Sequence, residues 1–144
     1  MSNEEHFRKL ERMYNRAPCN EYYSPKLTIS KGVAEVVISV QQKFHHVVGA
    51  VHGSVYFKAL DDAAFFAANS LVEDVFMLTT SFNTYLFRPV TSGEMKAIGK
   101  VVQASTNVFV AEASLRNSEG EEIARGIGTF VRSKTLLSPD IGYE

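Results

Sequence analysis

The segment Ser54–Leu71 constrains the fold of this chain more than any other part, because it has the length of a helix and is apolar on almost every side. A helix that is apolar nearly all round is buried on most of its surface. After Glu73 and Asp74 the apolar residues recur with a period of two, which is typical of strands. The sequence therefore predicts a central helix enclosed by strands.

Strands are expected on both sides of this helix. The predicted segments are Leu27–Val40, which divides into two strands if Lys31 and Gly32 form a turn, and then Val75–Arg88, Met95–Thr106, Val108–Arg116 and Glu122–Ser133. Gly126 and Gly128 indicate a bend or a close backbone approach in the last strand. This pattern favours an α+β fold in which a curved antiparallel sheet wraps around a long helix. We expect pairing between subunits to cover its exposed edges.

The length of 144 residues suits one compact domain and is too short for two. Within residues 1–144, we assign 1–25 to an N-terminal helix and loop, and 134–144 to a tail without a strong pattern. The helix is predicted over about Glu4–Arg16, with Asn3 as its N-cap. Asn20–Pro25 is predicted to be a loop.

Composition excludes several classes of function. Fifteen Lys and Arg against sixteen Asp and Glu give a net charge of -1, which argues against a nucleic-acid partner. Cys19 is the only cysteine, so no intrachain disulfide and no thiolate metal cluster are expected. The charge-free stretch Phe44–Phe57 is too short to span a membrane, and the first residues are charged where a signal peptide is apolar. We expect a cytoplasmic protein with no membrane partner, no metal and no cofactor.

The start of the central helix offers hydrogen-bond donors. Backbone N–H groups at Gly53 and Ser54 lack intrahelical acceptors, and the helix dipole makes this end positive. Such an end stabilises a carbonyl oxygen that is becoming an oxyanion. The alternative is that Gly53 only starts the helix and Ser54 only caps it.

Two neighbouring carboxylates occupy different sides of the helix. Asp62 is in line with Lys58 and Asn69, so we expect a solvated polar face on which Lys58 and Asp62 pair. Asp61 lies on an apolar stripe with Phe57, where a carboxylate needs a partner or a chemical role. Capping of a neighbouring backbone group is the alternative role for Asp61.

The spacing of Gly53 and Asp61 restricts how they can act together. Eight residues of helix separate them by about 12 Å. A reacting carbonyl must lie within about 3 Å of both an oxyanion donor and a base or nucleophile. Two copies of the helix, antiparallel across a two-fold axis, would bring Gly53 of one beside Asp61 of the other.

The segment His52–Asp61 resembles the His-Gly-Gly…Asp signature of the hotdog-fold acyl-CoA thioesterases of the phenylacetate-pathway and 4-hydroxybenzoyl-CoA thioesterase superfamily. The Asp follows the His by nine residues, as in that family, and Gly49 also matches. The similarity covers roughly 32–131 and includes weaker matches over 82–89 and 124–130. The second Gly of the signature is Ser54 here.

The resemblance implies a hotdog fold, assembly as dimers or dimers of dimers, and thioester hydrolysis. It assigns the oxyanion N–H to Gly53, the base or nucleophile to the partner's copy of Asp61, and water positioning to Thr79. Where the family often has Asn, this chain has His46, which either donates a hydrogen bond to the thioester oxygen or has no role. His52 is expected to order the loop rather than act as a base.

The expected substrate is an acyl-CoA or related thioester. The residues assigned to its binding are His52, Ser54, Gly49, Phe57, Phe82 and Tyr85. Aromatic residues near the helix, which also include Phe65 and Phe66, either line an acyl pocket or belong to the core. Two other functions stay open. One is a hotdog dehydratase or hydratase that pairs His45 or His46 with Asp61, and the other is a non-catalytic acyl-CoA binding module.

Overall fold

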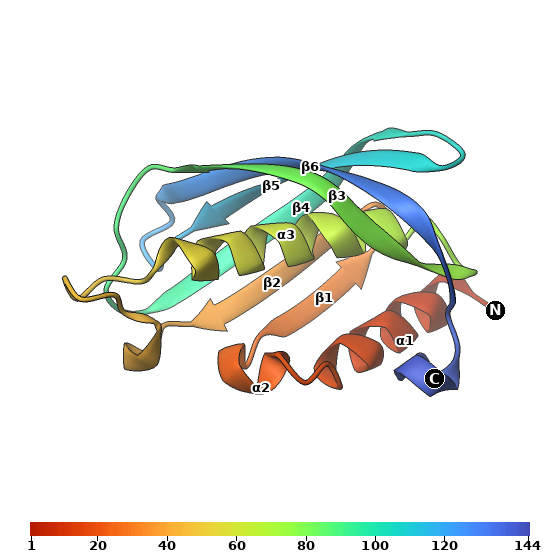
Figure 1. Cartoon of the computed structure of the whole chain (residues 1–144), viewed down its shortest axis with the longest axis horizontal. Coiled ribbons are helices and arrows are strands. Elements are labelled where there is room, and N and C mark those ends of the chain that lie inside the picture. The colour runs from red at the N-terminus through yellow and green to blue at the C-terminus, as the bar shows by residue number, and fades with distance from the viewer.

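A computed structural model describes all residues, 1–144, and contains one curved sheet with a long helix across it (Figure 1). The elements are α1 (Asn3–Asn15), α2 (Asn20–Tyr23), β1 (Lys26–Ser30), β2 (Val33–Ser39), α3 (Gly53–Asn69), β3 (Val75–Leu86), β4 (Glu94–Ala104), β5 (Val108–Arg116) and β6 (Glu122–Leu136). The six strands are antiparallel, in the order β1-β2-β4-β5-β6-β3. This arrangement confirms the expected α+β fold. None of the helices combines the length and the apolar character needed to cross a bilayer.

A row of small residues forms the surface on which α3 lies. Ala34 of β2 pairs with Gly99 of β4, Gly99 pairs with Ala113 of β5, and Ala113 pairs with Gly126 of β6. A side chain at Gly99 would collide with the backbone of Ala63 in α3. Because α3 is itself rich in alanine, its backbone comes very close to the sheet, and the position of the helix is fixed.

The aromatic ring of Phe82 explains both glycines of the last strand. The ring lies against Gly126 and Gly128, and a Cβ atom at either position would collide with it. The predicted close approach is therefore correct. The partner that makes the approach is a side chain of the neighbouring strand β3.

The N-terminal region differs from its prediction in two details. Ser2, not Asn3, caps α1, because its hydroxyl accepts from the N–H of Glu5 while the Glu5 carboxylate accepts from the N–H of Ser2. The segment predicted to be a loop contains the short helix α2, which ends where Ser24 adopts a left-handed conformation (φ 49°). The strand region before α3 is divided into β1 and β2, and Gly32, at φ 72°, lies in the turn between them.

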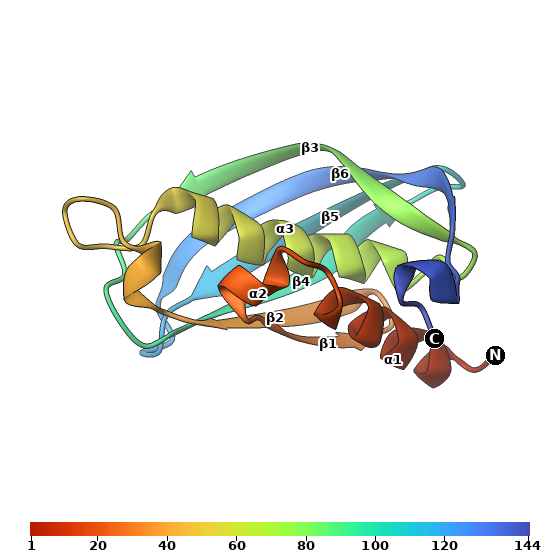
Figure 2. The same cartoon turned by 60° about the horizontal axis from the view of Figure 1, so that its bottom comes forward.

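The two end segments of the chain lie side by side (Figures 1 and 2). His6 of α1 is fully buried, with Nε2 donating to the carbonyl of Asn69 (2.9 Å) and Nδ1 2.8 Å from the hydroxyl of Tyr143. At the surface, Arg16 pairs with Glu144 at 2.6 Å. These contacts attach both α1 and the tail to the C-terminal end of α3.

The close contact at Gly99 predicts a large loss of stability for Gly99→Ala. The added methyl group meets helix backbone, which cannot move aside as a flexible side chain would. We therefore expect a loss of about 2 kcal/mol or more, measured by urea unfolding. Lys100→Ala, at the next residue on the exposed side of β4, is the control. Its stability should stay within about 0.5 kcal/mol of wild type, and equal stability of both variants would contradict the close packing.

Candidate functional site

The first residue of α3 presents an unpaired hydrogen-bond donor. The N–H of Gly53 has no acceptor in the chain. Ser54 does not cap the helix as considered above. His52 is the N-cap, and its Nδ1 accepts from the N–H of Ser54 at 3.0 Å, while the Ser54 hydroxyl lies 2.9 Å from the same nitrogen. His52 therefore orders the start of the helix, as predicted, and leaves the Gly53 donor free.

A cavity of about 310 Å³ lies at this donor and brings Gly53 and His46 together. The other residues that line it are Ala50, Val51, Tyr56, Leu86, Phe87, Arg88 and Pro89. The Nδ1 atom of His46 accepts from the N–H of Val48 at 3.1 Å. A neutral imidazole that accepts at Nδ1 carries its proton at Nε2, so His46 presents a donor and not a base on that side.

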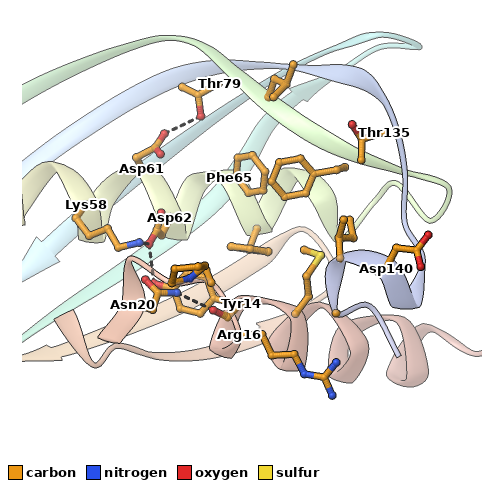
Figure 3. Close-up of a pocket in the computed structure, with 18 of the residues that line it drawn as sticks. Tyr14, Arg16, Asn20, Lys58, Asp61, Asp62, Phe65, Thr79, Thr135 and Asp140 are labelled. Carbon is orange, nitrogen blue, oxygen red and sulfur yellow. Dashed lines mark hydrogen bonds and ion pairs between the residues drawn. The ribbon is translucent and has the colours of Figure 1, made fainter. Parts of the chain in front are cut away.

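Asp61 lies two turns further along α3 and is held by Thr79 of β3. The Thr79 hydroxyl donates to Asp61 Oδ1 at 3.0 Å (Figure 3). Burial raises the pKa of Asp61 to about 6, while the Thr79 hydrogen bond works in the opposite direction and the neighbouring Asp62 raises the pKa further. A carboxylate with a pKa near neutrality can take up and release a proton under physiological conditions.

The prediction of a solvated face at Asp62 is wrong. The Asp62 side chain is only 15% exposed, because α1 covers it and Tyr14 donates to Oδ2 at 2.6 Å. The predicted pair with Lys58 is present at 2.7 Å. Asn69, on the same stripe, is fully buried, and its amide bonds the backbone of Val72, Val75 and Met77. The polar stripe therefore faces packed parts of the protein rather than water.

A second, larger cavity of about 910 Å³ opens beside Asp61 and Thr79 (Figure 3). Its walls come from α1 and the segment after it, from α3 and β3, and from the C-terminal tail. Its apolar side chains are Met13, Phe65, Phe66, Phe76, Leu78 and Ile141. Gly53 and His46 do not line this cavity, and Asp61 does not line the smaller one.

The structure brings the remaining predicted binding residues to neither cavity. Gly49 lies at φ 86° in the turn that follows His46. Phe57 and Phe82 pack edge to face, with ring centroids 5.5 Å apart, and Phe82 also covers the glycines of β6. Tyr85 is an exposed residue of the edge strand β3.

Several cavity residues were missed by sequence reasoning. Tyr56 is buried in α3 and also lines the smaller cavity, where its hydroxyl donates to the carbonyl of Arg88 (2.8 Å). Phe76 and Leu78 lie in β3, where the alternation of apolar and polar residues predicts a strand but does not indicate which of its faces lines a cavity. The apolar stripe of α1, with Met13 and Tyr14, was the one signal that pointed to a covering helix.

Comparisons with known proteins identify the family of the chain and relatives with the same fold. Residues 48–124 match the sequence profile of the thioesterase superfamily. The chain is 24% identical over 111 residues to a protein of Saccharolobus solfataricus described as a candidate esterase, covering 77% of this chain and 79% of that protein.

Two solved structures show the same fold. The PaaI protein from the phenylacetic acid degradation operon of E. coli has a TM-score of 0.85 at 17% identity, over 94% of this chain and 99% of that one. A thioesterase of Haemophilus influenzae has a TM-score of 0.78 at 16% identity, over 87% and 88%.

The raised pKa of Asp61 predicts that Asp61→Asn stabilises the protein at neutral pH. Folding favours the protonated carboxyl, so the stability that this group contributes is fully present below about pH 4 and is lost as the pH rises through about 6. Removing the charge should therefore raise the free energy of unfolding at pH 8 by up to about 3 kcal/mol and have little effect at pH 4. Urea unfolding at both pH values measures this difference. Asp140→Asn, at an exposed carboxylate, should show no such pH-dependent gain.

Proposed function

Because the chain belongs to the thioesterase superfamily, we propose that it hydrolyses acyl-CoA thioesters to a free acid and coenzyme A, at a site made by two copies of the chain. Thioester hydrolysis is the activity of the family. The acyl-CoA substrate and the shared site are the proposed additions. Both are argued from Gly53 and Asp61.

One observation carries the shared site. The free N–H of Gly53 and the carboxylate of Asp61 belong to one unbroken helix and line different cavities. They are about 12 Å apart along the helix axis. A single chain therefore cannot place both groups within about 3 Å of one carbonyl. A second copy with its α3 antiparallel to the first satisfies this requirement twice, once at each end of the pair.

The edge strand β3 is the surface best suited to such pairing. β3 has β6 on one side and no strand on the other. Exposed apolar side chains lie on it, next to it and on the neighbouring part of α3. They are Phe57, Leu78, Tyr85, Leu86 and Phe87. An apolar sheet edge with free backbone groups favours association with an identical edge.

In the proposed reaction, the thioester carbonyl oxygen accepts from the N–H of Gly53 and from Nε2 of His46. Asp61 of the partner subunit either removes a proton from a water molecule that attacks the carbonyl carbon, or attacks that carbon itself. The new C–O bond produces an oxyanion that both donors stabilise. The C–S bond then breaks, and coenzyme A leaves as a thiolate. Where Asp61 has attacked directly, a water molecule then hydrolyses the mixed anhydride, which releases the free acid and restores the Asp61 carboxylate. Thr79 holds the Asp61 carboxylate in position throughout.

The hydrogen bonds of the histidines favour hydrolysis over the dehydratase alternative. A dehydratase needs a histidine that accepts a proton from carbon, but the Nδ1 of His46, which lines the smaller cavity, already accepts from the N–H of Val48. His45 uses its Nε2 to donate to the carbonyl of Thr91 at 3.0 Å. Loss of water from a 3-hydroxyacyl-CoA without release of thiol would support the dehydratase. Tight binding of acyl-CoA with neither reaction would support a binding module.

Substitutions at the two ends of the site should each abolish most of the activity. Asp61→Asn removes the base or nucleophile, and we expect kcat to fall by about 10²–10⁴-fold. Gly53→Pro removes the N–H without disturbing the helix, because proline fits the first position of a helix and His52 already has an extended conformation (ψ 143°). Its Cβ comes within 3.0 Å of the flexible end of the Leu86 side chain, as the Cβ of alanine would. We expect a loss of about 10²–10³-fold, measured by thiol release from acyl-CoA. Gly53→Ala adds a side chain but keeps the N–H, so it is the matched control and should retain activity well above Gly53→Pro.

Mixing the two inactive variants tests whether the site is shared. When Asp61→Asn and Gly53→Pro chains are refolded together in equal amounts, about half of the dimers contain one chain of each kind, and one of their two sites is intact. We expect recovery of about a quarter of the wild-type activity. Asp61→Asn refolded with Asp61→Ala is the control and should recover nothing. If the first mixture also recovers nothing although mixed dimers have formed, the site lies within one chain.

A further inference from the structure

We infer that the larger cavity holds the acyl group of the substrate, and that the two end segments of the chain make it select apolar acyl groups of medium to long chain length. This inference rests on the proposed thioester hydrolysis. It adds a binding site inside a single chain, and a substrate class, to a reaction that takes place between two chains.

The location of the cavity follows from Asp61. This carboxylate must reach the carbonyl carbon or its attacking water, so the acyl chain attached to that carbon begins beside it. Asp61 and Thr79 line one end of the larger cavity, and the space continues from there between α1, α3 and the tail (Figure 3). On α3 its walls extend from Lys58 to Phe66. This span corresponds to about 12 Å of helix.

The chemistry of the walls favours an apolar ligand. Aromatic and aliphatic side chains of α3, β3 and α1 line the cavity. The buried polar groups in the same walls have partners: Asp62 accepts from Tyr14 and pairs with Lys58, and Asn20 donates to the carbonyl of Tyr14. Arg16 pairs with Glu144 at the surface, and Thr135 and Asp140 are exposed to solvent. An acyl group inside the cavity therefore gains apolar contacts and meets no buried unpaired charge apart from Asp61 itself.

The size of the cavity favours a long or bulky acyl group. Its volume of about 910 Å³ compares with about 310 Å³ for the cavity beside Gly53. Sites for small organic ligands are typically concave and mostly apolar, and a volume of this size lies within their usual range. The smaller cavity therefore suits the carbonyl end of the substrate, and the larger one suits the hydrocarbon part.

Much of the enclosure comes from outside the region that matches the family. The family profile covers residues 48–124, but Met13, Tyr14 and Ala17 form one wall and Ile141 and Gly142 another. The buried contact of His6 with Tyr143 holds these two walls together. The end segments of this chain, together with α3 and β3 of the shared core, thus determine how much space the acyl group has.

Filling the cavity from the wall after α1 tests the inference. Ala17→Phe adds a ring to a residue that lines the cavity but is distant in sequence from Asp61 and Gly53. We expect the ratio of kcat/KM for dodecanoyl-CoA to that for acetyl-CoA to fall by about tenfold or more, because several methylene groups lose their contacts. Ala104→Phe makes the same change at an exposed position on β4 and should keep the wild-type ratio. Ile141→Trp narrows the cavity from the tail and serves as a second test if Ala17→Phe does not fold.

Calorimetric binding of dodecanoate, the free acid, separates this inference from the proposed function. If the wild-type protein releases thiol from no acyl-CoA, the proposed function fails, and dodecanoate binding alone decides about the cavity. Weaker dodecanoate binding to folded Ala17→Phe or Ile141→Trp than to Ala104→Phe supports the inference. An unchanged substrate ratio together with unchanged dodecanoate binding in the folded variants overturns it.

Discussion

The contact between the backbone of α3 and Gly99 of β4 determines where the central helix lies, and the positions of both reactive groups follow from it. A single methyl group at this point would push the helix away from the sheet. Because the helix is rigid, its distance from the sheet is set for all of its length, including Gly53 at the start and Asp61 in the middle. The row of alanine and glycine residues across four strands thus fixes the position of α3 and, through it, the positions of Gly53 and Asp61.

Two adjacent carboxylates of that helix have opposite environments. Asp62 has a cation and a phenol as partners, both of which favour its charged form against the effect of burial on its pKa. Asp61 has one hydroxyl group and no cation bonded to it, and its pKa is correspondingly high. Burial raises the pKa of both carboxyls, so the two differ in their partners: Asp62 is held by a cation and a phenol, whereas Asp61 is bonded by a single hydroxyl and lies at the cavity. The cost of burying Asp61 is consistent with a group kept for reactivity rather than for stability.

The sequence allowed the fold to be predicted because local patterns determine it. The apolar helix and the period-two strands follow from residue size and spacing, and Gly126 and Gly128 indicated a bend or a close approach without naming Phe82 as the partner. The environment of Asp62 could not be predicted in this way, since the Lys58–Asn69 stripe looks polar until α1 is placed over it. The acyl cavity was missed for a related reason. Its walls join Met13, Phe76 and Ile141, which are distant in the sequence and meet only through tertiary packing.

The strand order has a consequence for how the chain is assembled during synthesis. β3 pairs within the sheet only with β6, which follows all the other strands of the sheet in the sequence. Until β6 emerges, β3 has no strand on either side, and the backbone groups that pair with β6 in the folded chain are unpaired. Tyr143 is synthesised after β6, so the buried contact between His6 and Tyr143 can form only once residue 143 has been synthesised. The nascent protein therefore passes through a stage in which the sheet is incomplete and has unpaired strand edges. At that stage, association with chaperones or with other nascent chains competes with correct folding.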